Sequence, residues 1–138
     1  MIDLSSELGM RVARRLGSEL IIWLTTVRVD GTPQPSPVWF LWADRTILIY
    51  SQQNKQKLRN IAQNPKVALN FNTDPQGGDV AVITGTARVD PQAPPVDQLR
   101  AYVEKYRQEI VDLGATPESF AQSYAVAVRV TPIGLRGF

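Results

Sequence analysis

The sequence predicts a mainly β protein: a small antiparallel β-barrel of six strands, closed or half-closed, with a few short helices. Six segments are rich in β-branched and aromatic residues or alternate apolar with polar positions, as strands do. Turn-forming residues separate most of them, and the helical patterns between them are short. The 138 residues, 43% apolar and 20% charged, suit one globular domain spanning residues 1–138.

The first part of the chain predicts a helix followed by an antiparallel meander. Apolar residues recur every four positions over 4–17, which is typical of a helix that buries one face. Residues 20–29 then form a mostly buried strand, and Asp30-Gly31 is a strong hairpin signal. The return strand is expected at 34–42, and a third strand follows at 46–51.

The remainder predicts three further strands and a few helices. Asn54 is a candidate N-cap for a short helix. Gly85, inside a strand pattern, indicates a bulge or a close approach of backbone. In chain order, the expected elements are a helix at 54–64, strands at 66–72 and 80–89, an amphipathic helix at 96–113, a cap at 116–119 followed by a short helix, and a strand at 124–130.

The composition excludes several kinds of active site, because the chain contains no histidine and no cysteine. Serine–histidine triads, histidine-ligated zinc, thiolate nucleophiles and disulfide frameworks are therefore ruled out. No pair of carboxylates has a convincing catalytic spacing, and we expect no metal site. If the protein is an enzyme, we expect the reactive group to sit on a bound cofactor.

Charge is unevenly distributed along the chain. Residues 45–73 hold five basic residues and no acidic one, whereas the formal net charge of the whole chain is only +2. A small anion such as a phosphate-bearing ligand suits this block, but on composition alone a solvated basic face is favoured. The small net charge argues against a nucleic-acid partner. The first 19 residues do not resemble a signal peptide, and the longest apolar run, Leu20–Leu24, is too short to span a membrane. We therefore expect a soluble, cytoplasmic protein with no membrane partner.

Two features of the basic block and its surroundings could serve a ligand. Lys55 and Lys57 fall in the first turn of the helix expected at 54–64, where the helix dipole disfavours cations. A bound phosphate would reverse that penalty, and two solvated surface lysines are the alternative. Upstream, three alternating prolines at 33–37 remove the donors along one edge of a strand. That edge is either a protected sheet edge, which is favoured, or a surface that faces a ligand.

Aromatic residues follow the proline segment. Trp39 and Phe40 are neighbours on the expected strand, so their side chains point to opposite faces. One should fill the barrel, and the other should look outward into an interface or over a ring.

These residues resemble those of the pyridoxamine 5′-phosphate oxidase-like flavin-binding superfamily. The resemblance lies in Pro-Ser-Pro-Val-Trp-Phe at 35–40 and in Lys-Leu-Arg-Asn-Ile-Ala-Gln-Asn-Pro at 57–65, and it extends over nearly the whole chain. Within the superfamily, the chain is most similar to the short enzymes that depend on the deazaflavin F420. The residues that hold substrate phosphate in the true oxidase are missing, which puts oxidation of pyridoxamine phosphate in doubt.

The resemblance implies a split, FMN-binding-like β-barrel that works as a homodimer with its cofactor sites at the interface. It implies an oxidoreductase that transfers a hydride between F420 and a small conjugated molecule. The alternatives are an FMN-dependent oxidoreductase and a non-catalytic protein that binds a flavin or deazaflavin. Lys55 and Lys57 would hold the phosphate, and the other residues would line the ring. The implied cofactor-binding residues are Ser36, Pro37, Val38, Trp39, Phe40, Ser51, Gln52, Lys55 and Lys57.

Overall fold

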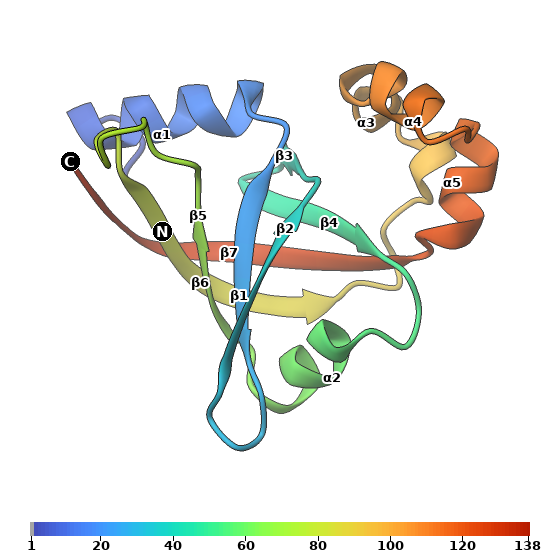
Figure 1. Cartoon of the computed structure of the whole chain (residues 1–138), viewed down its shortest axis with the longest axis horizontal. Coiled ribbons are helices and arrows are strands. Elements are labelled where there is room, and N and C mark those ends of the chain that lie inside the picture. The colour runs from blue at the N-terminus through green and yellow to red at the C-terminus, as the bar shows by residue number, and fades with distance from the viewer. Residues whose placement is uncertain (1) are drawn as a thin grey trace.

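The computed structural model describes residues 2–138 and shows one curled antiparallel sheet with short helices around it (Figure 1). The seven strands follow the order β2-β1-β5-β6-β7-β4-β3. They are β1 (Ile22–Val27), β2 (Pro33–Val38), β3 (Leu41–Ala43), β4 (Thr46–Ser51), β5 (Lys66–Asn70), β6 (Ala81–Val89) and β7 (Val126–Gly137). The helices are α1 (Glu7–Ser18), α2 (Gln56–Gln63), the 3-10 turn η1 (Val96–Gln98), α3 (Arg100–Lys105), α4 (Arg107–Asp112) and α5 (Pro117–Ser123).

The strand order explains why the sheet curls. β2 and β3 occupy opposite edges of the sheet, yet only Trp39 and Phe40 separate them along the chain. The two edges must therefore approach each other at this corner, while the hairpin end of β2 lies away from it. The result is a half-barrel in which every strand pairing is antiparallel. The predicted mainly β class is confirmed.

The predicted count of six strands is wrong because the strand expected at 34–42 breaks at the corner. There the Phe40 N–H donates to the Tyr106 hydroxyl at 2.9 Å, and the Lys105 amine donates to the Phe40 carbonyl at 2.8 Å. The corner backbone is thus bonded to the helical region instead of to a neighbouring strand. Because the Phe40 backbone forms these hydrogen bonds instead of strand pairing, β2 ends here and β3 begins in a new direction.

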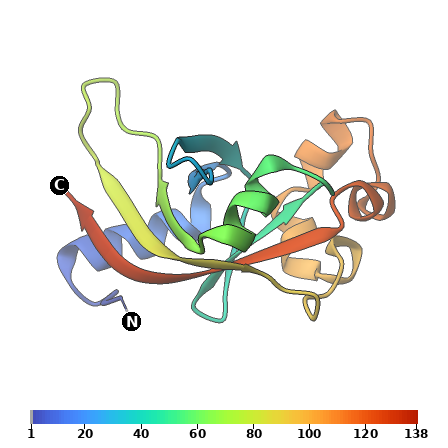
Figure 2. The same cartoon turned by 90° about the horizontal axis from the view of Figure 1, so that it is seen from below.

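Two apolar clusters stabilise the molecule. The first fills the half-barrel and includes Phe40, while Ile61 of α2 closes its mouth against β1 and β6. The second lies between β4 and helices α3–α5 and includes Tyr102 and Tyr106. Figure 1 and Figure 2 place these helices at one end of the sheet and α1 at the other. The molecule therefore has a barrel core and a separate helical core, joined at the corner.

Several predicted boundaries move for local reasons. The first helix begins at Glu7 because the Ser6 hydroxyl caps it, accepting from the Gly9 N–H at 3.0 Å. Asn54 is not the N-cap of α2: it adopts a left-handed φ of 62°, and Lys55 caps the helix without a side-chain bond. The helix expected at 96–113 is divided into η1, α3 and α4.

Other expectations hold. A register shift lies between Thr84 and Gly85, and a Cβ on Gly85 would approach the Thr131 carbonyl oxygen to 2.5 Å, so the bulge and the close approach are both confirmed. The proline strand β2 is an edge of the sheet, as the three missing donors predict. No helix within residues 2–138 is long and apolar enough to cross a membrane.

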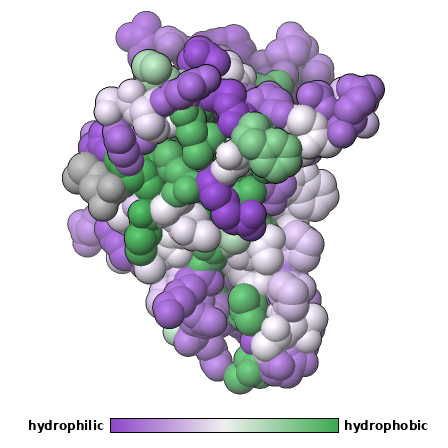
Figure 3. Space-filling model, turned by 90° about the vertical axis from the view of Figure 1, so that its left-hand side faces the viewer, coloured by the Kyte–Doolittle hydropathy of each residue, from purple (hydrophilic) through white to green (hydrophobic). Residues whose placement is uncertain are grey.

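Figure 3 shows apolar side chains gathered on one face of the molecule and surrounded by polar ones. A hollow of about 270 Å³ lies between the N-terminal segment and β7, with Leu8 and Leu135 among its lining residues. Ile133 also lines it and is 57% exposed.

Candidate functional site

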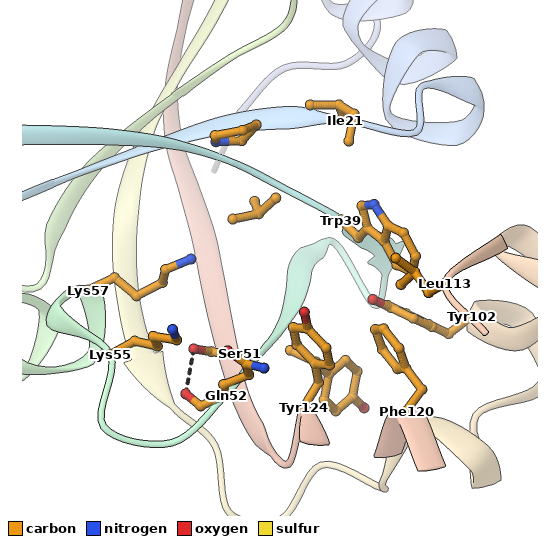
Figure 4. Close-up of a pocket in the computed structure, with 13 residues that line it drawn as sticks. Ile21, Trp39, Ser51, Gln52, Lys55, Lys57, Tyr102, Leu113, Phe120 and Tyr124 are labelled. Atoms are coloured by element: carbon orange, nitrogen blue, oxygen red, sulfur yellow. Dashed lines mark hydrogen bonds between the residues drawn. The ribbon is translucent and has the colours of Figure 1, made fainter. Parts of the chain in front are cut away.

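A cavity of about 480 Å³ lies between the half-barrel and helices α3–α5 (Figure 4). Its lining residues are Ile21, Pro37, Val38, Trp39, Tyr50, Ser51, Gln52, Lys55, Lys57, Tyr102, Leu113, Phe120 and Tyr124. This volume is within the range of small-molecule and cofactor sites. Seven of the nine residues predicted to bind a cofactor are among them. The two others, Ser36 and Phe40, do not line the cavity, and Phe40 is fully buried in the barrel core.

One end of the cavity is cationic. Lys55 is the N-cap of α2 and Lys57 is the second residue of the helix, which has no acidic residue in its first turn. Figure 4 shows the Lys57 amine pointing into the cavity beside Lys55. Burial, and then the charge of Lys55, lowers the pKa of Lys57 below its ordinary value. Among residues 2–138, no carboxylate forms a salt bridge with either lysine.

A buried polar network fixes the position of α2. The Asn60 side-chain amide, 1% exposed, donates to the Thr26 hydroxyl of β1 at 2.9 Å and to the Gln34 amide oxygen of β2 at 3.0 Å. Its own oxygen accepts from the Gln56 amide at 2.8 Å. The two lysines therefore stand on a helix tied to both strands of the first hairpin. Sequence reasoning missed Asn60, although a polar residue among the apolar positions of a short helix is a usable signal.

The polar floor of the cavity comes from the end of β4. Ser51 is 3% exposed, and its hydroxyl donates to the Gln52 carbonyl at 2.8 Å (Figure 4). The Gln52 side chain is partly exposed beside it. These residues lie near the lysines because the loop from β4 leads directly into α2.

The other end of the cavity is aromatic, and its rings stack nearly parallel. Trp39 stacks on Tyr106 with centroids 4.6 Å apart and on Phe120 at 5.3 Å, and Phe120 stacks on Tyr124 at 4.4 Å. The interplanar angles are 4°, 11° and 12°. Trp39 thus points out of the barrel while Phe40 fills it, as the alternation predicts. The partners of Trp39 were not predicted, because they come from helices about 65 to 85 positions further along the chain.

The family model for pyridoxamine 5′-phosphate oxidase matches residues 10–136. The chain belongs to this family. Its fold is therefore a flavin-binding one, and the superfamily expected from residues 35–40 and 57–65 is confirmed. No curated protein matches the chain.

Solved structures with the same fold carry different names. An F420 reductase is 25% identical, covers 89% of this chain and 94% of its own, and has a TM-score of 0.65. The heme storage protein HutZ of Vibrio cholerae is 16% identical, with coverage of 96% and 95% and a TM-score of 0.66. A FAD-binding protein of Mesorhizobium loti is also 16% identical, with coverage of 91% and 88% and a TM-score of 0.63. These similarities support the fold. Because the three names refer to different cofactors, the cofactor of this chain has to be argued from the residues of its cavity.

The described part of the chain contains no cluster of side chains suited to hold a metal ion. Within residues 2–138, no three side chains of His, Cys, Asp or Glu gather as metal ligands. The groups that line the cavity are ammonium, hydroxyl, amide, aromatic and aliphatic groups. Such groups bind an anion at one end and a flat apolar ring at the other.

Proposed function

We propose that the protein is a cytoplasmic F420-dependent oxidoreductase that transfers a hydride between the deazaflavin and a small conjugated molecule. The observation that carries the proposal is Lys57, a half-buried cation at the start of α2 with no carboxylate partner in the described chain. It faces the same cavity as Pro37 and Trp39. The site thus offers an anion and a ring system one continuous space.

The physical argument rests on the start of α2. By position, the N–H groups of Gln56 and Lys57 have no partner inside the helix, and the helix dipole adds positive potential there. Each lysine costs roughly 0.3–1 kcal/mol in this place. A phosphate or carboxylate ligand turns that cost into attraction, because the N–H groups and both ammonium groups converge on one anion. We infer that Lys55 and Lys57 hold the acidic part of the cofactor.

The bound cofactor supplies the hydride chemistry. The chain contributes binding and orientation: lysines at the anionic end, Pro37 and Val38 along the ring, and Ser51 and Gln52 beside it. FMN is the alternative cofactor, since it also joins a flat ring to a phosphate. The F420 reductase relative supports the deazaflavin, and the acidic tail of F420 suits a pair of lysines at least as well.

Parallel titration of the purified protein with F420, FMN and heme tests the proposal. We expect F420 to bind in the micromolar range, and Lys57→Ala to weaken it about tenfold, or about 1.4 kcal/mol. Because the pKa of Lys57 is lowered, its ammonium loses its proton at a lower pH than an ordinary lysine does. As the pH is raised, the affinity for F420 should therefore begin to fall earlier than it would with an ordinary lysine. The control is Arg14→Ala, which removes the same charge from an exposed residue of α1 outside this cavity.

The outcomes separate the alternatives. Tight binding of FMN without binding of F420 would refute the deazaflavin and support the FMN enzyme. Reduced cofactor that stays reduced with every electron acceptor tried would support a non-catalytic binding protein. Equal loss of F420 affinity in the Lys57 and Arg14 variants would show that the start of α2 does not hold the anion.

We also propose that the protein forms a homodimer that completes the site. The outer face of the sheet supports this, because Thr25, Ala68 and Thr84 leave a hollow of about 380 Å³ beside the exposed Ile133. An apolar hollow on an open sheet face suits a second copy of the chain. Sedimentation at micromolar concentration should show a dimer, and a monomer would count against a shared site.

A further inference from the structure

We propose that the Tyr102 hydroxyl donates a hydrogen bond to a neutral acceptor oxygen, of the carbonyl class, on a flat substrate bound at the aromatic end of the cavity. The inference deepens the proposed function, on which it rests for identifying this ligand as the substrate. It assigns the aromatic end to the substrate and the cationic end to the cofactor.

Tyr102 combines deep burial with an unused polar group. The residue lies on α3, is 1% exposed and lines the cavity. Within residues 2–138, no protein group forms a hydrogen bond with its hydroxyl, and no buried side-chain polar atom of that stretch lacks a partner, so the Tyr102 oxygen must be open to the cavity. Figure 4 shows the hydroxyl oxygen pointing into the cavity, toward the side of Trp39. The remaining place for a partner is therefore the cavity itself.

The two other buried tyrosines of the cluster use their hydroxyls within the protein. Tyr50 donates to the Pro94 carbonyl, and Tyr106 donates to the Leu20 carbonyl at 2.7 Å. A ligand that displaced water from the Tyr102 hydroxyl without replacing its hydrogen bond would leave the group unsatisfied, at a cost of about 1–3 kcal/mol. A ligand oxygen that accepts from Tyr102 avoids that cost, so the structure favours a ligand with such an oxygen.

The rings around Tyr102 fix its direction. Its ring packs edge-on against Tyr50, with centroids 5.3 Å apart, and lies 4.9 Å from Tyr106 and 6.3 Å from Phe120. Three aromatic neighbours on different elements leave the side chain little freedom to turn away. The hydroxyl is therefore held in place before a ligand arrives, which lowers the cost of binding.

The chemistry of the surroundings selects a neutral, flat ligand. Burial, and then the neighbouring Tyr106, raises the pKa of Tyr102 well above its ordinary value, so the hydroxyl stays protonated and donates. The stacked rings of Phe120 and Tyr124 offer aromatic surface to a conjugated molecule. An anion would instead be drawn to Lys55 and Lys57 at the opposite end.

A matched pair of probes tests the inference: 1-indanone and indane are similar bicyclic molecules that differ by one carbonyl. NMR titration of the purified protein should show 1-indanone binding about tenfold more tightly than indane. Tyr102→Phe should weaken 1-indanone about tenfold and leave indane within about twofold. Tyr124→Phe is the control, because Tyr124 lines the same cavity but is partly exposed and reaches water.

Tyr102→Phe should not lower the urea midpoint, because it removes a hydroxyl without a protein partner. Equal affinity of 1-indanone for wild type and Tyr102→Phe would overturn the inference, as would a loss caused by Tyr124→Phe instead. Failure of both probes to bind wild type would overturn it as well. Tyr102→Phe should leave the affinity for F420 unchanged. Failure of F420 to bind would therefore refute the cofactor proposal, whereas the 1-indanone result tests this inference separately.

Discussion

The corner between β2 and β3 depends on one hydroxyl, and replacing it tests how the fold closes. Tyr106 is fully buried. Its oxygen accepts from the Phe40 N–H at 2.9 Å and donates to the Leu20 carbonyl at 2.7 Å, with the Phe40 carbonyl further away at 3.1 Å. Tyr106→Phe removes these bonds and keeps the ring that stacks on Trp39. The variant therefore isolates the hydrogen bonds from the packing.

The magnitude follows from the groups left behind. An unpaired, buried Phe40 N–H costs about 1–3 kcal/mol, and the lost bond to Leu20 contributes about 0.5–1.5 kcal/mol. We expect Tyr106→Phe to lower the free energy of unfolding by roughly 2–4 kcal/mol. That is a large share of the roughly 5–15 kcal/mol that stabilises an ordinary domain.

Urea unfolding at pH 7, followed by circular dichroism, measures this loss. The control is Tyr124→Phe, since the Tyr124 hydroxyl has no hydrogen-bond partner within residues 2–138, and it should change stability by less than about 0.5 kcal/mol. The denaturant slope should stay the same in both variants, because the surface exposed on unfolding is unchanged. A loss below about 0.5 kcal/mol in Tyr106→Phe would refute the idea that the hydroxyl holds the corner.

Two further predictions concern the bulge and a buried amine. Gly85→Ala should destabilise the protein by about 1–3 kcal/mol, because the new Cβ would meet the Thr131 carbonyl oxygen at 2.5 Å. Gly17→Ala is the control: no atom lies within 4 Å of its new Cβ, so it should be neutral or stabilising. Urea unfolding in which Gly17→Ala is the less stable variant would contradict this prediction. Burial lowers the pKa of Lys105 to about 8 from its ordinary 10.5. The unfolded chain thus holds that proton more tightly, and wild type should gain stability relative to Lys105→Met as the pH rises from 8 to 10.5, with no change in the difference below pH 8. A difference that shrinks in that window would mean that the contact of the amine with the Phe40 ring, 3.6 Å to the centroid, outweighs desolvation.

Strands whose pattern is local were predictable from the sequence. Residues 46–51 form β4 with the predicted bounds, because a buried strand needs only its own apolar run and flanking turns. Residues 34–42 do not form one strand, because Tyr106 and Lys105 bind the backbone of Phe40 from more than 60 positions away. The sequence of the segment alone does not indicate these partners, so its periodicity overestimates the length of the strand.

The candidate site divides in the same way. The lysines at the start of α2 were predictable because the penalty from the helix dipole is a local effect. Predicting Asn54 as the N-cap was wrong by one position, since Asn54 takes a left-handed conformation and Lys55 is the N-cap. Tyr102 and Phe120 could not be placed from the sequence, because the helical patterns there do not show which cavity a side chain reaches.

The two ends of the cavity show how a chain without histidine or cysteine could serve the proposed redox reaction. Burial shifts Lys57 and Tyr102 in opposite directions, lowering the pKa of the ammonium and raising that of the phenol. Lys57 then supplies charge and Tyr102 a neutral donor, and burial gives Tyr102 no tendency to release its proton near pH 7. Groups of this kind position a cofactor and a substrate and stabilise them in a dry site. In the proposed reaction the electron pair would come from the bound cofactor, so binding at the two ends, measured separately, is the decisive property of this site.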